Sequence, residues 1–172
     1  MMDTELAAFK NTLQYDFFES DLAAVNRSRT PWVIFMGHRP MYSSSDNATG
    51  LDIASGPWMP DIEDLLYAHQ VDLALWGHVH NAEQTCPLYR GKCVQAETPG
   101  TYDAPVHAVI GNAGQSLTKF PETHPVWSLW RFSEFGYATI EVQGAKELTM
   151  RFWADADNGL VHKFSIQGKE RG

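Results

Sequence analysis

The chain has 172 residues, of which 44% are hydrophobic, and a formal net charge of −8 at pH 7. This length and composition are typical of one globular domain with a core of its own and exclude a disordered chain. The acidic balance argues against nucleic acid as a partner, no apolar run predicts a transmembrane segment, and the first residues do not predict a signal peptide.

The first third of the chain predicts a helix, a strand and a loop. Residues 14–25 predict an amphipathic helix, because apolar side chains recur there at helical spacing. Residues 32–36 form a continuous apolar run, which is typical of a strand covered on both faces. Residues 41–56 are rich in Ser, Asn, Asp and Gly, so we expect a loop.

The middle third repeats this order. Residues 60–69 predict a second short helix with Pro60 near its start, and residues 71–76 predict another buried strand. A helix–strand–helix–strand order indicates a layered α/β sheet. We expect residues 81–102 to form a polar loop and residues 106–110 to form a further strand.

The last third shows alternating apolar and polar residues. Three stretches, 137–142, 148–152 and 160–166, predict strands, with turns at Gly144 and at Asn158. We expect these antiparallel strands to close the sheet. No boundary divides the chain, so residues 1–172 are interpreted as a single domain.

Cysteines and sequons favour an extracellular setting. Cys86 and Cys93 bracket a short loop that contains Pro and Gly, which favours a disulfide, two free thiols being the alternative. Asn26 and Asn47 begin glycosylation sequons, although sequons also occur by chance.

Histidines follow two of the predicted strands. The motif GHRPMY stands at residues 37–42 and GHVH at residues 77–80. Histidines at the carboxyl ends of strands face the crevice where open α/β sheets bind ligands, and neutral imidazole binds zinc, iron or manganese. His38, His78 and His80 therefore predict a metal site, surface histidines in loops being the alternative.

Other polar residues have competing interpretations. Arg39 is placed to contact a phosphate, or else forms an ordinary salt bridge. His69 is interpreted as a helix-end residue. His107 lies within an apolar strand, as a core histidine or as a partner of a metal ligand, and His162 is interpreted as structural.

The two histidine motifs closely resemble the last two metal-binding motifs of purple acid phosphatases, within the calcineurin-like metallophosphoesterases. Segments 26–32, 83–93 and 157–166 are also similar to that family. The resemblance implies an α/β fold: a partial metallophosphoesterase β-sandwich flanked by helices, with C-terminal antiparallel strands. It identifies residues 1–172 with the C-terminal half of the catalytic domain.

The resemblance also implies site roles. His38 and His78 would bind a divalent metal, Zn(II), Mn(II) or Fe(II), and His80 the Fe(III) of a binuclear centre. A metal-bound hydroxide would hydrolyse phosphate monoesters, with Arg39 as a substrate contact. Family members of this type are expected to be secreted, extracellular or vacuolar.

The chain departs from the family pattern. The earlier motifs Asp-x-Gly, Gly-Asp-x-x-Tyr and Gly-Asn-His are absent, Leu6 stands where relatives often carry histidine, and Ala82 stands where tyrosine is common. We therefore expect a fragment with weak metal binding and little phosphatase activity. It would lack an N-terminal half, supplied by another chain or not at all, or would form a homo-oligomer.

Two other functions remain open. One is a mononuclear three-histidine zinc hydrolase, assisted by Asp46, Asp52 or Asp103. The other is a non-enzymatic remnant that binds a partner through its exposed sheet edge.

Overall fold

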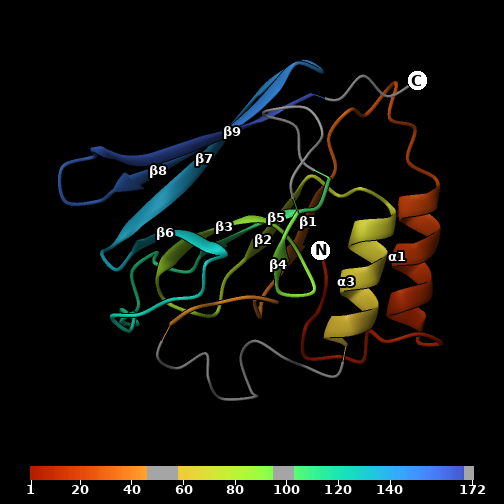
Figure 1. The fold of residues 1–172 in the computed structure, drawn as a ribbon, viewed down its shortest axis with the longest axis horizontal. Helices are drawn as coiled ribbons and strands as arrows, with labels where there is room; N and C mark the ends of the chain where they lie inside the picture. The colour runs from red at the N-terminus through yellow and green to blue at the C-terminus, as the bar shows by residue number, and fades with distance from the viewer. Residues whose placement is uncertain (46–57, 95–102, 169–172) are drawn as a thin grey trace.

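The chain folds into three layers: two helices, a mixed sheet and a second, antiparallel sheet (Figure 1). The structure, a computed structural model, describes residues 1–45, 58–94 and 103–168. Asp46, Asn47 and Asp52 lie outside the described residues, as does most of the predicted loop 41–56. No helix in the described ranges is long and apolar enough to cross a membrane.

Both predicted helices are confirmed. Helix α1 spans Leu13–Ala23, and its N-cap residue Thr12 accepts a hydrogen bond from the backbone N–H of Tyr15. Helix α3 spans Met59–Ala68 and has a proline in its first turn. The two helices bury their apolar side chains against one face of the main sheet, as the core residues Phe18, Leu22, Ile62, Leu65 and Leu66 indicate.

Three parallel strands form the first part of the main sheet. They are β1 (Ile34–Gly37), β2 (Leu73–Trp76) and β5 (Val106–Ile110), in the order β1-β2-β5. All three coincide with predicted strands. Parallel pairing puts the carboxyl ends of β1 and β2 at the same edge, because Gly37 is in register with Trp76.

The prediction that β1 is covered on both faces is wrong. Ile34 and Met36 are 37% and 43% exposed, whereas Phe35 on the opposite face is buried. Among the described elements β1 is the edge strand of the sheet, whereas β2 is buried at every position. An apolar run alone does not distinguish an edge strand from a central one.

The predicted polar loop after residue 80 is instead a strand. Strand β3 (Ala82–Tyr89) pairs antiparallel with β5, and β4 (Lys92–Cys93) and β6 (Ser128–Phe132) pair antiparallel with β3. The polar residues of β3 are buried with partners, which is why polarity misled the prediction. Glu83 is 1% exposed and accepts hydrogen bonds from the Ser44 N–H and from the Ser44 and Ser128 hydroxyls.

The last three predicted strands are confirmed, but they form a sheet of their own instead of closing the main one. Strands β7 (Gly136–Gln143), β8 (Glu147–Ala154) and β9 (Leu160–Gln167) are antiparallel in the order β7-β8-β9. Their inner residues pack on the main sheet face opposite the helices. This second core contains Leu73, Val106, Ala108, Leu148, Met150 and Ile166.

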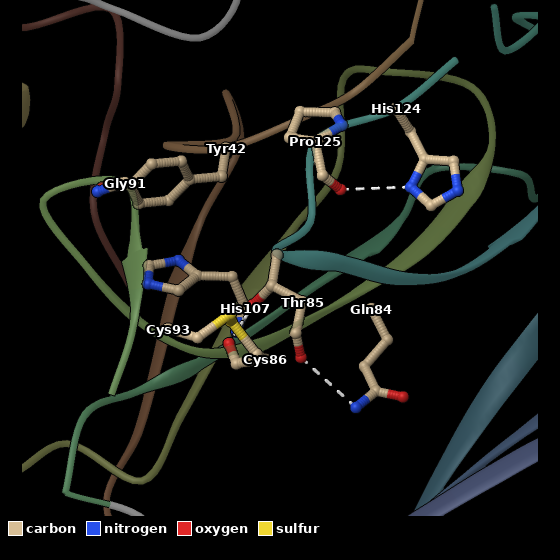
Figure 2. The surroundings of a disulfide bond; sticks show 9 residues. All are labelled: Tyr42, Gln84, Thr85, Cys86, Gly91, Cys93, His107, His124 and Pro125. Carbon is tan, nitrogen blue, oxygen red and sulfur yellow. Dashed lines mark hydrogen bonds between the residues drawn. A yellow bond between two sulfur atoms is a disulfide. The ribbon is translucent and has the colours of Figure 1, made fainter. Parts of the chain in front are cut away.

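The Cys86–Cys93 pair forms a disulfide across the β3–β4 hairpin (Figure 2). Figure 2 shows Tyr42 and His107 in the surroundings of this disulfide. The predicted disulfide is therefore confirmed, and the alternative of two free thiols is wrong.

Candidate metal-binding site

His38 and His78 meet because the strands that precede them are parallel neighbours. Strand β1 ends at Gly37 and strand β2 ends at Trp76, directly opposite each other. The chains stay joined beyond the strands, since the Gly77 N–H donates to the His38 carbonyl at 2.9 Å. Gly37 allows close approach here: a Cβ at this position would lie 2.5 Å from the Trp76 ring.

The two imidazole rings converge on each other. His78 Nδ1 lies 3.0 Å from His38 Nε2, and the rings are nearly perpendicular, at 85°. His78 has a φ of 58°, a left-handed conformation that is uncommon outside glycine and clusters at functional sites. This backbone turn directs the His78 ring back toward His38.

The spacing of these nitrogens suits a shared metal ion. Zinc–imidazole bonds of about 2.0–2.1 Å at a tetrahedral angle place two ligand nitrogens about 3.3 Å apart. The 3.0 Å separation of the His38 and His78 nitrogens is close to that value. Both nitrogens offer a lone pair to a metal ion when each ring carries its proton on its other nitrogen.

His80 lies apart from this pair in its hydrogen bonding. Its Nδ1 contacts the Ser116 hydroxyl at 2.8 Å, and its carbonyl accepts from the Thr118 N–H. The described residues contain no group of three His, Cys, Asp or Glu side chains arranged to hold one metal. The structure thus brings two of the three predicted ligands together.

Arg39 is held by an ion pair beside the histidines. Its guanidinium donates to both carboxylate oxygens of Glu5, at 2.5 and 3.1 Å. The backbone N–H of Arg39 donates to the Thr4 hydroxyl. The Arg39 guanidinium lowers the pKa of Glu5, with smaller effects of His38 and His78. Glu5 is therefore an anion next to the pair, a neighbour that the sequence motifs do not indicate.

The electrostatic surroundings favour neutral imidazole at His78. Partial burial, followed by the positive charges of Arg39 and His38, lowers the pKa of His78 below its ordinary value. Neutral imidazole is the form that binds metal. A mainly apolar hollow of about 270 Å³ adjoins the pair and is lined by residues of the β1, β2 and β5 ends, including His38, Met36, Leu75 and Ile110.

The remaining histidines lie away from the pair. His69 follows α3 as its C-cap, as predicted. His107 is 1% exposed in β5 and accepts a hydrogen bond from Trp76 Nε1 at 3.1 Å, which makes it a core residue. His162 lies on β9, stacks on Trp130 and forms a hydrogen bond with Gln84. Because Trp130 and Gln84 belong to the main sheet, His162 joins the two sheets.

Sequence motifs missed two groups near the histidines. Ser116 and Glu5 lie 36 and 34 residues along the chain from the side chains that they contact, His80 and Arg39. Neither residue stands in a recognisable pattern. Only their position in the folded chain identifies them.

Two family models match the chain. Residues 2–82 match the model for calcineurin-like phosphoesterases, and residues 104–163 match that for iron/zinc purple acid phosphatase-like protein C. The chain is 33% identical over 169 residues to "Probable inactive purple acid phosphatase 24" of Arabidopsis thaliana and 31% identical over 169 residues to a nucleotide pyrophosphatase/phosphodiesterase of Hordeum vulgare. Each alignment covers 95% of this chain.

A solved structure shows the same fold. The purple acid phosphatase PPD1 from yellow lupin seeds superposes with a TM-score of 0.90 at 33% identity, over 98% of this chain and 30% of the lupin chain. The chain spans 28% of the length of the Arabidopsis relative and 46% of the barley relative. The mixed α/β fold expected from sequence is thereby confirmed, and the chain belongs to the purple acid phosphatase family of calcineurin-like phosphoesterases.

Proposed function

We propose that this chain contributes His38, His78 and His80 to a binuclear metal centre that hydrolyses phosphate monoesters. The observation that carries the proposal is the convergence of His38 Nε2 and His78 Nδ1 at 3.0 Å, at the carboxyl edge of two parallel strands. The donor set suits Zn(II), Mn(II) or Fe(II) at this pair, with Fe(III) as the second ion near His80.

The residues of the chain would position both ions and substrate. His38 and His78 would hold the divalent ion through the nitrogens that now face each other, and His80 would use the nitrogen that Ser116 does not contact. Arg39 lies next to His38 and would donate to a phosphate oxygen in place of Glu5. When bound, the metal ions would neutralise phosphoryl charge and activate water.

We further propose that this chain on its own binds metal weakly and hydrolyses esters slowly. Three neutral imidazoles bring no negative charge to two cations, and the Glu5 carboxylate is already paired with Arg39. The sequence contains no Gly-Asp dipeptide to provide the aspartate expected in this family. That the Arabidopsis relative is named "probable inactive" supports the same proposal.

Zinc titration followed by calorimetry tests the ligand assignment. Loss of a residue that only hydrogen-bonds a metal ligand typically lowers metal affinity about 10–100-fold. We expect His38→Ala and His78→Ala, which each remove a ligand, to lower zinc affinity by at least that factor. His124→Ala removes an exposed histidine outside the pair and serves as the matched control. Unchanged zinc binding in both site variants would reject the assignment.

Hydrolysis of p-nitrophenyl phosphate with added iron and zinc tests the reaction. Slow turnover that is lost in His78→Ala but kept in His124→Ala supports the binuclear proposal. Full activity with about one zinc per chain would instead favour the mononuclear three-histidine hydrolase, the alternative from sequence.

A second candidate function is binding of a partner through the β1 edge. It is favoured by the exposure of Ile34 and Met36 on this edge strand. On the outer side of β1, the described structure has a single isolated β-bridge, between Met2 and Gly37. The occupant would be a segment that completes the sheet, either in another polypeptide or in a second copy of this chain. Partner binding that survives His78→Ala would separate this function from metal binding.

A further inference from the structure

Segment 2–5 lies beside the end of β1, and its residues alternate between the interior and solvent. Met2 and Thr4 are buried, whereas Asp3 and Glu5 are exposed. The Met2 N–H donates to a carbonyl of β1 at 2.7 Å, and Met2 forms a parallel bridge with the last residue of that strand. The alternation therefore puts the Glu5 carboxylate on the solvent side, close to the point where β1 ends.

The backbone of this segment is fixed by α1 and by the residues that follow β1. The Gln14 side chain of α1 accepts from the Asp3 N–H at 2.7 Å and donates to the Asp3 carbonyl at 3.0 Å. The Thr4 hydroxyl accepts from the Arg39 backbone N–H at 3.0 Å, and Asp3 Oδ1 accepts from the Glu5 N–H at 2.9 Å. Glu5 is thus held beside Arg39 by its backbone, so a change of partner requires only side-chain rotation.

The Glu5 carboxylate occupies two N–H groups of Arg39 that a phosphoryl group would also use. Arg39 Nε donates to Oε1 at 2.5 Å and Nη2 donates to Oε2 at 3.1 Å, so the contact is bidentate. Carboxylate and phosphate are the two anions that arginine binds in this paired geometry. Because both anions need the same N–H groups, they compete for them.

Arg39 is placed to act on a phosphoryl group at the histidine pair. It directly follows His38 in the chain. Burial, followed by the Arg39 charge, lowers the pKa of His78, which puts the guanidinium within electrostatic reach of the pair. The Glu5 charge offsets that of Arg39, so the ion pair makes this side of the site less attractive to a phosphate dianion.

We propose that Glu5 is an internal competitor of the phosphoryl group, which must displace the Glu5 carboxylate from Arg39 in order to bind. This inference rests on the proposed function, in which Arg39 contacts the substrate. The Glu5 side chain is 56% exposed and its released carboxylate passes into water, whereas the Arg39 side chain is only 28% exposed. No covalent bond changes, because one charge-assisted pair replaces another.

The strength of partly exposed ion pairs sets the size of the expected effect. Such pairs typically shift an equilibrium constant by about 2–5-fold. We therefore expect Glu5→Ala to bind inorganic phosphate about 2–5-fold more tightly than the unchanged chain. Arg39→Gln should bind phosphate more weakly than either, because it lacks the N–H groups for which the two anions compete.

The test is a titration of the full, metal-free chain with inorganic phosphate, followed by ¹H–¹⁵N NMR through the side-chain Nε–H signal of Arg39. Ionic strength is kept constant with chloride so that screening does not change. Arg39→Gln identifies the signal. A saturable shift with a lower half-saturation concentration in Glu5→Ala supports the proposal, whereas equal affinities, or no shift in either chain, would overturn it.

A zinc titration of the same proteins separates this inference from the proposed metal centre. Failure of the unchanged chain to bind zinc would reject the metal centre, and the phosphate titration would still be readable because it contains no metal. We expect Glu5→Ala to keep the zinc affinity of the unchanged chain. A loss of zinc affinity in Glu5→Ala would make Glu5 a metal ligand and would contradict its role as a competitor.

Two further variants separate pairing with Arg39 from a general effect of charge. Glu5→Asp keeps the negative charge but shortens the side chain by one methylene, which weakens the bidentate contact, so phosphate should again bind more tightly. Glu141→Ala removes a carboxylate of nearly equal exposure, 52%, from Arg151, which is 28% exposed like Arg39. It should leave the phosphate affinity at Arg39 unchanged. No gain in Glu5→Asp, or an equal gain in Glu141→Ala, would show a general charge effect and overturn the proposal.

Discussion

At the scale of single residues, hydrogen bonding fixes which nitrogen of His80 is free. The Ser116 hydroxyl donates to Gln115 Oε1 at 2.5 Å, so it accepts from His80 Nδ1. A neutral His80 then carries its proton on Nδ1 and its lone pair on Nε2. In the proposed metal centre, Ser116 would hold His80 in the tautomer that binds metal through Nε2, as partners of metal-binding histidines commonly do.

Replacement of Ser116 tests this orientation. We expect Ser116→Ala to lower zinc or iron affinity about 10–100-fold, because the His80 ring loses the partner that fixes its tautomer. Calorimetric metal titration provides the measurement. Ser133→Ala is the matched control, since Ser133 donates only to the Thr118 carbonyl in the described structure. Equal affinities in the two variants would contradict the orienting role of Ser116.

The sequence indicates part of this site for a clear physical reason. His38 and His78 each follow an apolar strand, and parallel neighbouring strands end at one edge, so their proximity follows from topology. The Ser116 contact depends on the path of an irregular segment after β5, which no local pattern determines. The left-handed φ of His78, 58°, is likewise not indicated by a local pattern.

At the scale of elements, carboxylates of α3 hold the β3–β4 hairpin, whose own two strands are joined by the disulfide. Glu63 accepts from the Arg90 N–H at 2.7 Å and from the Tyr42 hydroxyl, and Asp64 accepts from Tyr89 and Arg90. The Tyr67 and Tyr89 rings also stack at 3.9 Å. These contacts should preserve the position of the hairpin when the disulfide is reduced.

Reduction of the disulfide should therefore lower stability without disturbing the histidine pair. Closing a loop of this length stabilises the folded state by about 2.5 kcal/mol in the chain-entropy description. We expect urea unfolding under reducing conditions to show a loss of about that size, with zinc affinity unchanged. The Cys86→Ala/Cys93→Ala variant should show no effect of reductant. A loss of zinc binding on reduction would contradict the independence of hairpin and site.

Strand prediction succeeded where side-chain polarity follows burial and failed where it does not. The alternation in β8 places Leu148, Met150 and Phe152 in the core between the sheets, as its pattern predicts. Strand β3 carries Glu83, Gln84 and Thr85 into the interior, where hydrogen bonds offset their desolvation. Such compensation depends on partners distant in sequence, so a local pattern indicates a loop there.

At the scale of the whole molecule, His107 joins the main sheet to the helical layer. Its ring lies parallel to that of Trp76, which stacks on Trp58, and meets the Tyr42 ring edge-on. Trp76 Nε1 donates to His107 Nδ1, so the neutral ring carries its proton on Nε2. Protonation of Nδ1 would break this bond and place a charge in the core.

Stability should consequently depend on pH through His107. Burial lowers the pKa of His107 from 6.5 to about 3, so the unfolded chain binds this proton first. The stabilising contribution is complete above pH 6.5 and is lost progressively as the pH falls toward 3, by up to about 1.4 kcal/mol per pH unit. We expect His107→Gln, which can still accept from Trp76, to reduce the loss of unfolding free energy between pH 6 and pH 5 in urea titrations. The exposed His124→Gln variant should retain the full slope, and identical slopes for all three proteins would show that His107 does not stay neutral in the folded state.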